Sequence, residues 1–227
     1  MRTPSRVLVL AGLLCGAGAA MAASSGAPSM PQMRMPEQRS PEQQAAAAYN
    51  DGVRAVKKAD KAAAEAARAT DTGKQAKLAK RANESYSRAL SKFEDAVALV
   101  PALHEAWNYI GYTKRNLGDY EGALQAYDRT LAISPGYPQA IEYRGQAYLK
   151  LSRLEDAKNA YLQLYAGNRE LSNQLLTAMR DWIGTQRSGT PPDPAALEAF
   201  AKWVDERAAI AGQTAALTRE GAAASWN

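Results

Sequence analysis

A long segment without proline follows the amino-terminal part of the chain. Residues 42–100 are dominated by Ala, Lys, Glu, Arg and Gln, which have strong helix propensities. The only turn-like cluster inside this segment is Asp71-Thr72-Gly73, so the pattern predicts an antiparallel hairpin of two long helices, residues 41–70 and 74–99. Alanines at helical spacing predict a close seam between the two limbs: Ala59, Ala62, Ala63 and Ala66 on the first, and Ala76, Ala79 and Ala82 on the second.

Two amphipathic patterns lie near the carboxyl end. Residues 171–183 place apolar side chains on one helical face, and residues 197–210 do so again after a proline-rich stretch at 188–194. The chain is 46% hydrophobic, but much of this is alanine, and there are only 2 Phe and 4 Trp. This composition favours helices packed through small side chains over a sheet rich in Val and Ile. We therefore expect an all-α fold.

Residues 107–135 contain the pattern of a helical hairpin. Gly111 and Ala123 are small where two helices would cross, Gly118 would close the turn between them, and Pro135 would end the second helix. The pattern also includes Trp107, Ile110, Tyr120, Tyr127 and Leu131. It resembles the tetratricopeptide repeat, a helix-turn-helix unit of 34 residues, with Lys114 where that family usually has Tyr.

Shifting this pattern by 34 residues in either direction gives two further copies. The later copy aligns Ile141, Gly145, Tyr148, Ala157 and Tyr161, and it departs from the family at Arg144, Ser152 and Arg169. The earlier copy aligns Tyr86, Ala89, Phe93, Ala96 and Pro101, and its first helix aligns if Gly52 takes the place of Gly111. Gly52 to Ala89 is 37 positions and Gly111 to Ala123 is 12, so the first repeat has 25 extra residues.

The extra residues divide almost evenly about the turn, about 12 per helix, and they predict an arm roughly 18 Å long. The resemblance therefore implies a tetratricopeptide-type solenoid of about three helical hairpins, the first one elongated. The amphipathic segments near the carboxyl end are suited to capping the open end of such a stack.

The amino terminus has the pattern of a targeting segment. Arg2 and Arg6 precede an apolar run at residues 7–14 and the small-residue pattern Ala20-Met21-Ala22, which predicts a secretory signal peptide cleaved before Ala23 and a periplasmic protein. A lipid anchor at Cys15 is the alternative, although Leu14 stands where lipobox sequences have a small residue. The apolar run is too short for an ordinary membrane span, so we expect no transmembrane helix.

These patterns divide the chain into six parts. We expect a signal peptide at residues 1–22, a disordered linker at 23–41, the elongated first repeat at 42–101, two repeats at 102–168, capping helices at 169–215 and a frayed tail at 216–227.

The composition excludes most enzyme chemistry. With one cysteine and one histidine, a zinc cage, a disulfide framework or a Ser/His/Asp triad would lack its usual parts. We therefore expect no catalysis, no cofactor and no metal at His104. Met30, Met33 and Met35 form a thioether cluster that suits Cu(I), and the alternative is a plain flexible linker.

Positive charge is concentrated in one segment. The chain has 28 basic and 23 acidic residues, a net charge of +5, which becomes +3 without Arg2 and Arg6. Residues 57–81 hold eight cations against Asp60, Glu65 and Asp71, so this segment alone is +5. A general affinity for polyanions is not implied, but a local basic arm is.

The tetratricopeptide resemblance also implies where a ligand would bind. In that family the first helix of each repeat lines a concave groove that usually holds a peptide segment of a partner. The corresponding candidate residues here are Tyr49, Asn108, Tyr112, Arg115, Asn116, Glu142, Gln146 and Lys150. The asparagines suit a peptide backbone, Arg115 and Lys150 suit a carboxylate, and Tyr112 offers a flat apolar contact. The alternative is ordinary solvated helix surface.

Two classes of function fit these patterns. The first is a non-enzymatic scaffold or adaptor of the bacterial cell envelope, which binds a segment of another envelope protein in the groove. The second is a polyanion-binding or self-associating envelope protein that acts through the basic arm at residues 57–81, without specific nucleic-acid recognition. In the first class the arm is only a spacer.

Overall fold

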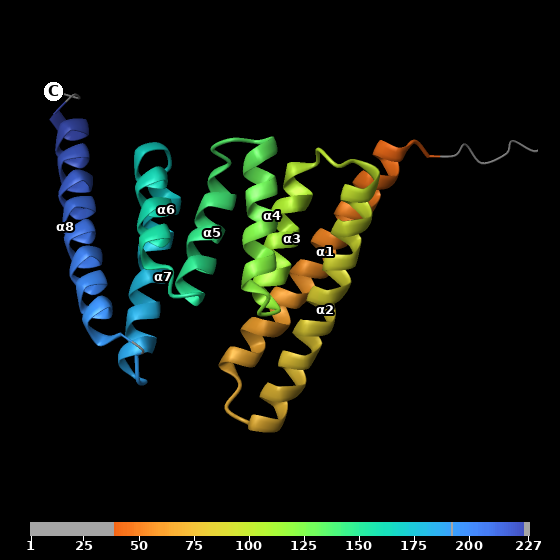
Figure 1. The fold of residues 1–227 in the computed structure, drawn as a ribbon, viewed down its shortest axis with the longest axis horizontal. Helices are drawn as coiled ribbons and strands as arrows, with labels where there is room; N and C mark the ends of the chain where they lie inside the picture. The colour runs from red at the N-terminus through yellow and green to blue at the C-terminus, as the bar shows by residue number, and fades with distance from the viewer. Residues whose placement is uncertain (1–38, 192, 225–227) are drawn as a thin grey trace, which may run out of the picture. The chain divides into compact units, whose positions relative to one another are not determined.

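The chain folds into α-helices that pack in hairpin pairs. The computed structural model describes residues 39–191 and 193–224, with side chains as far as Thr214. In this part of the chain there are eight helices and no strand (Figure 1): α1 (Pro41–Arg68), α2 (Thr72–Leu99), α3 (His104–Asn116), α4 (Tyr120–Ile133), α5 (Pro138–Lys150), α6 (Leu154–Gly167), α7 (Arg169–Arg187) and α8 (Pro194–Ala224). The expected all-α, tetratricopeptide-like fold class is confirmed. The predicted signal peptide and the cluster of Met30, Met33 and Met35 lie outside the described residues.

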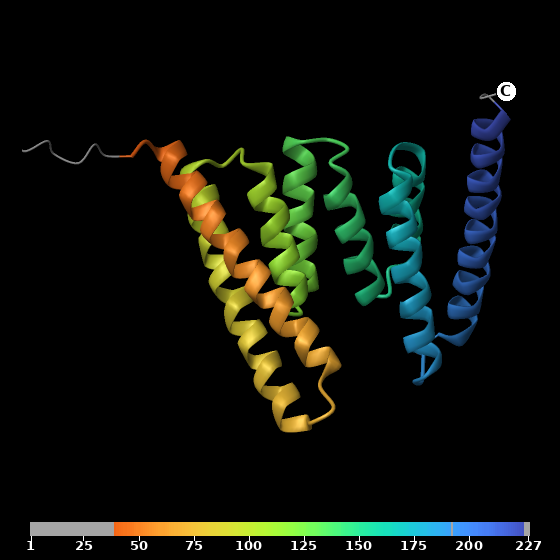
Figure 2. The ribbon, with the colours of Figure 1, turned by 180° about the vertical axis from the view of Figure 1, so that it is seen from behind.

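Each helix contacts the next one along the chain, and α7 contacts both α5 and α6. Helices α1 and α2 have 28 residues each, against 13 or 14 in α3 to α6, so the first hairpin is the elongated one. Figure 2 shows this hairpin continuing past the turn between α3 and α4. Among the described helices, none is both long and apolar enough for a membrane span.

Local capping sets the ends of the long hairpin. Ser40 Oγ accepts a hydrogen bond from the Gln43 N–H at 3.3 Å, while the Ser40 N–H donates to Gln43 Oε1 at 3.1 Å, which is a capping box. Asp71 Oδ1 accepts from the Lys74 N–H at 2.6 Å and caps α2. The sequence had predicted that Thr72 and Gly73 belong to the loop between the two helices. Because Asp71 is the N-cap, they belong instead to the first helical turn of α2.

The predicted alanine seam is correct on α1 and only partly correct on α2. Ala59, Ala62, Ala66 and Ala82 are buried, but Ala76 and Ala79 are exposed. The buried face of α2 follows Ala82, Tyr86, Ala89 and Phe93, and the half-buried Leu78 continues it toward the tip. Position 76 lies off this helical face, whereas Ala79 keeps its 3/4 spacing with Ala82 and Tyr86 and is still exposed, so the close seam on α2 ends at Ala82.

The hairpin crossings repeat along the chain. Ala89, Ala123 and Ala157 are each 0% exposed, and so are Phe93, Tyr127 and Tyr161 four residues later. A Cβ built on Gly52 would lie 2.6 Å from Cε1 of Phe93, and one built on Gly111 would lie 2.6 Å from Cδ1 of Tyr127. An aromatic ring therefore occupies the space that a glycine leaves open in the first two hairpins.

The third hairpin departs from this scheme at the equivalent glycine. A Cβ on Gly145 would meet Leu175 of α7, 2.6 Å from its Cδ2 atom, instead of a ring of α6. Its turn also differs, because Ser152 takes a left-handed conformation with φ of 56° where the second hairpin has Gly118 with φ of 89°. The backbone of the turn is thus kept although the residue that favours it is not.

The last two helices cover the end of the third hairpin. Leu175, Met179 and Ile183 of α7 lie in one apolar core with Phe200 and Val204 of α8. Helix α8 packs on α7, and its Trp203 also contacts Tyr161 of α6 edge to face with ring centroids 5.5 Å apart. The backbone of α8 stays helical to Ala224, past the boundary at residue 215 that we expected.

We expect Gly111→Ala to lower the free energy of unfolding by about 1–3 kcal/mol, because the added Cβ would overlap the fully buried ring of Tyr127. Gly184→Ala in α7 is the matched control, since nothing lies within 4 Å of its added Cβ. That substitution should leave stability unchanged or slightly raised. Urea unfolding followed by circular dichroism measures both, and equal effects would show that the contact between Gly111 and Tyr127 does not hold the hairpin together.

Candidate functional site

The candidate residues lie on α1, α3 and α5, the first helices of three successive hairpins. Side-chain contacts join these helices across a surface that we call the inner face: Tyr49, Asp60, Tyr109, Tyr112, Arg115, Glu142, Tyr143 and Gln146. Five of these are among the eight residues expected from the sequence. The other three expected residues, Asn108, Asn116 and Lys150, belong to α3 and α5 as well.

Asp60 joins α1 to α3. Its Oδ1 atom accepts hydrogen bonds from Tyr86 Oη at 2.6 Å and from Tyr112 Oη at 2.8 Å. Burial and these hydrogen bonds to the carboxylate raise the pKa of both tyrosines above its ordinary value. The sequence analysis counted Asp60 only as an acid of the arm. The available signal was its position four residues after the buried Val56, on the same side of α1.

Arg115 joins α3 to α5. Its Nη1 atom donates to Gln146 Oε1 at 2.6 Å, and its guanidinium carbon lies 5.5 Å and 5.4 Å from the ring centroids of Tyr112 and Tyr143. Cation–π contacts of this kind favour a fixed guanidinium position. The structure thus places Arg115 in an internal contact between two helices, so this residue does not present its whole guanidinium to a carboxylate as the sequence analysis expected.

Glu142 is also turned into the protein. Only 1% of it is exposed, and one of its carboxylate oxygens accepts from Gln146 Nε2. Burial raises the pKa of Glu142, while the hydrogen bond from Gln146 and the charge of Arg115 oppose this rise. Glu142 therefore holds Gln146 in place for Arg115, and a ligand would not reach it directly.

The three remaining candidates differ in accessibility. Asn108 is buried, and its Oδ1 atom has no hydrogen-bond partner among the described residues. Asn116 is exposed and donates from Nδ2 to the Tyr112 carbonyl at 2.8 Å, which leaves its side-chain carbonyl free to accept. Lys150 is exposed at the end of α5. Asn116 and Lys150 are thus the candidates that a partner can contact without rearrangement.

An aromatic row that the sequence analysis missed runs along the inner face. Tyr49 contacts Tyr109, Tyr109 contacts Tyr112, and Tyr112 contacts Tyr143, with centroid separations of 5.8, 6.3 and 5.3 Å. Burial is the main cause that raises the pKa of Tyr49 to about 12. The period of the repeat was the signal for the missed members, because Tyr109 and Tyr143 are 34 residues apart.

Further features of the described residues lie outside the inner face. His104 contacts Glu105 at 3.2 Å and the ring of Tyr137 at 5.0 Å. No three His, Cys, Asp or Glu side chains lie close enough to hold a metal ion within residues 39–191 and 193–214. A pocket of about 570 Å³ beside Trp107 has an apolar floor of Val97, Ile110 and Ala126, and charges of both signs stand around it.

Comparison with known proteins supports the repeat pattern. A family model for the tetratricopeptide repeat matches residues 104–137, which hold α3, α4 and the turn that follows. The solved structures include a similar chain, the first TPR of Spaghetti (RPAP3) bound to the HSP90 peptide SRMEEVD. It is 18% identical, the match covers 62% of this chain and 96% of that one, and the TM-score is 0.46. No curated protein matches the sequence.

We expect Glu142→Gln to change how stability depends on pH. The folded-state pKa of Glu142 lies above its ordinary value, so the folded protein holds this proton more tightly than the unfolded chain does. Stability from this group is therefore lost as the pH rises from the ordinary value of about 4.3 through the folded pKa. The Gln variant should lack this loss, so its stability relative to the parent protein should rise with pH.

Thermal unfolding at a series of pH values above 4 measures this difference. Glu170→Gln is the control, because Glu170 lies exposed in the first turn of α7. A difference between the Glu142 variant and the parent that stays constant with pH would contradict the assignment of a raised pKa.

Proposed function

We propose that this chain is a non-enzymatic interaction module that binds a segment of a partner protein along the inner face of α1, α3 and α5. The observation that carries the proposal is the unbroken row of aromatic and hydrogen-bonding side chains that crosses three helices of successive hairpins. The tetratricopeptide match at residues 104–137 supports it, because repeats of this family typically bind peptides.

The inner face is held in place before any partner arrives. The hydrogen bond from Tyr112 to Asp60 ties α3 to α1, and the hydrogen bond from Arg115 to Gln146 ties α3 to α5. A surface that is already ordered loses less conformational entropy on binding than a flexible one. The half-buried rings of Tyr49 and Tyr112 offer rigid apolar contacts of the kind that dominate many interfaces.

The exposed polar residues indicate the type of segment. Asn116 retains a free carbonyl oxygen that suits a backbone N–H of a peptide, and Lys150 brings a cation to the end of α5. Because Arg115 is already engaged, Lys150 is the residue that we assign to a carboxylate of the bound segment. The ligand that fits best is thus an extended peptide with an acidic side chain or a free carboxyl end.

We also propose that the module works in the bacterial cell envelope. The basic start, the apolar run and the Ala20-Met21-Ala22 pattern of residues 1–22 support export. In that setting the partners would be other envelope proteins.

Substitution of the two exposed candidate residues, Asn116 and Lys150, tests the peptide site. Peptides selected from a displayed random library are expected to bind the purified chain, and the double variant Asn116→Ala, Lys150→Ala should weaken the best of them about tenfold, because each residue contributes a hydrogen bond or a charge. The control is Gln125→Ala, Lys202→Ala, two exposed residues on α4 and α8. Calorimetry measures the affinity of each variant. If the selected peptides bound the Asn116→Ala, Lys150→Ala variant as tightly as the parent protein, the binding site would lie elsewhere.

Export has its own test. Expression of the whole sequence in a Gram-negative bacterium is expected to yield a periplasmic protein that begins at Ala23, because the small residues before it match a cleavage site. Intact-mass spectrometry reads the start directly. A chain that begins at a lipid-modified Cys15, or one that keeps residues 1–22 and stays in the cytoplasm, would contradict the prediction.

A further inference from the structure

A pocket of about 310 Å³ lies between α1 and α2, away from the residues of the inner face. It is lined by Asp51, Arg54, Ala55, Lys58, Ser85, Arg88 and Lys92. Four of these seven residues are cations and one is an acid, while the buried Ala55 and Ser85 are the small residues among them. The long hairpin thus forms a basic recess at its own helix-helix junction.

The cations of this pocket are available to a ligand. Arg54 pairs with Asp51, and Lys92 pairs with Asp95 at 2.8 Å, but both pairs are well exposed. Exposed pairs contribute little to stability, so an external anion can exchange with their acids. Lys58 and Arg88 make no ion pair within the part of the chain that the structure describes. Two free guanidinium or ammonium groups and two exchangeable ones therefore face one recess.

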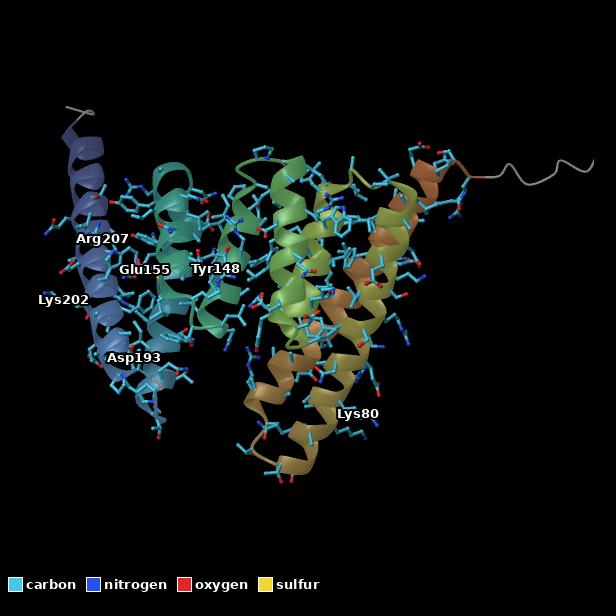
Figure 3. The ribbon with its side chains drawn as sticks, in the orientation of Figure 1. Lys80, Tyr148, Glu155, Asp193, Lys202 and Arg207 are labelled. Atoms are coloured by element: carbon cyan, nitrogen blue, oxygen red, sulfur yellow. The ribbon has the colours of Figure 1, made fainter. Side chains whose placement is uncertain are left out.

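The positive charge continues from the pocket toward the tip of the hairpin. Lys74, Lys77, Arg81 and Arg88 follow each other on α2 at spacings that keep them on one helical side, and Lys61 continues the line of Arg54 and Lys58 on α1. All of these side chains are exposed, as is Lys80, which is labelled on α2 in Figure 3. From Lys74 to Arg88 the row on α2 is about 21 Å long.

Two acidic residues of the hairpin are engaged in contacts within the chain. Asp60 accepts hydrogen bonds from Tyr86 and Tyr112, and Asp71 caps the first turn of α2. The segment at residues 57–81 has eight exposed cations against these two acids and Glu65, an excess of five positive charges. None of those eight cations forms an ion pair among the residues described. The excess charge of this segment is therefore displayed to solvent.

The chemistry of this surface points to phosphate groups. Lys and Arg are the residues that neutralise phosphates, and successive phosphates of a linear chain bring several negative charges to a recess with four cations. The pocket has no aromatic side chain on which a base could stack. The large exposed apolar residues in the described part are Leu99, Ile133, Leu162 and Ile210, and none lines the pocket or the row, so this surface has no anchor for insertion into a bilayer.

We propose that the pocket between α1 and α2 binds phosphate groups of a linear polyanion, which then follows the row of cations toward the tip of the hairpin. The site is separate from the inner face and does not depend on the function proposed for it. Lys58 and Arg88 make the main contacts in the pocket.

Inorganic polyphosphate is the probe for this proposal. It is expected to bind the purified chain with an affinity that falls steeply with salt, because binding releases counterions. The double variant Lys58→Gln, Arg88→Gln should weaken binding about tenfold and reduce the slope of log K against log salt by about two, one for each lost contact. The matched control is Arg180→Gln, Lys202→Gln, which removes the same charge from exposed residues of α7 and α8 (Figure 3 labels Lys202).

The affinity of the control variant for polyphosphate should stay within about twofold of that of the parent protein, because the pocket is intact in this variant. Circular dichroism confirms that each variant is folded. Undetectable binding of polyphosphate, or equal weakening by the two variants, overturns the proposal, since the second result shows an effect of net charge alone. If polyglutamate binds as tightly as polyphosphate, and the Lys58, Arg88 variant loses this binding too, the assignment to phosphate is overturned. If vesicles of anionic phosphatidylglycerol bind and polyphosphate does not, the ligand is a membrane surface, and the proposal of a linear polyanion is overturned as well.

Discussion

The close crossing of paired helices is the constraint on which the rest of the structure depends. At Gly52 and Gly111 an aromatic ring occupies the place that any larger side chain would need, and the alanines that precede those rings by four residues are fully buried. This contact sets the distance between the two helices of a hairpin and the rotation of each about its axis. The hairpins then pack on one another in chain order, so the contacts between hairpins depend on the geometry within each hairpin.

Polar side chains connect successive hairpins on the inner face. The hydrogen bonds from Tyr112 to Asp60 and from Arg115 to Gln146 reach across α1, α3 and α5, and the rings of Tyr112 and Tyr143 lie beside the Arg115 guanidinium. The third hairpin is continued by apolar contacts of Leu175 with Gly145 instead. The junctions between the first three hairpins thus combine buried apolar clusters with these polar contacts, whereas the junction at the cap is apolar.

The two proposed binding surfaces differ in their chemistry. Hydrogen-bonding and aromatic groups join the helices of the inner face, where Asp60 accepts from Tyr86 and Tyr112. Cations line the pocket between α1 and α2. The two surfaces use different residues, so substitutions separate them.

The sequence by itself determined the helical hairpins, their order and their crossings, because a 34-residue spacing of small and aromatic residues reflects the period of an α-helix and the length of a turn. The tetratricopeptide resemblance also placed the candidate residues, Tyr112, Arg115 and Gln146 among them, on α1, α3 and α5. Only the tertiary structure decided what these side chains do. Asp60 meets a tyrosine 52 residues away and Arg115 meets a glutamine 31 residues away, and such contacts depend on how separate hairpins are rotated against each other. Helical periodicity describes one helix at a time, so it contains no information on that rotation or on which charges it leaves unpaired.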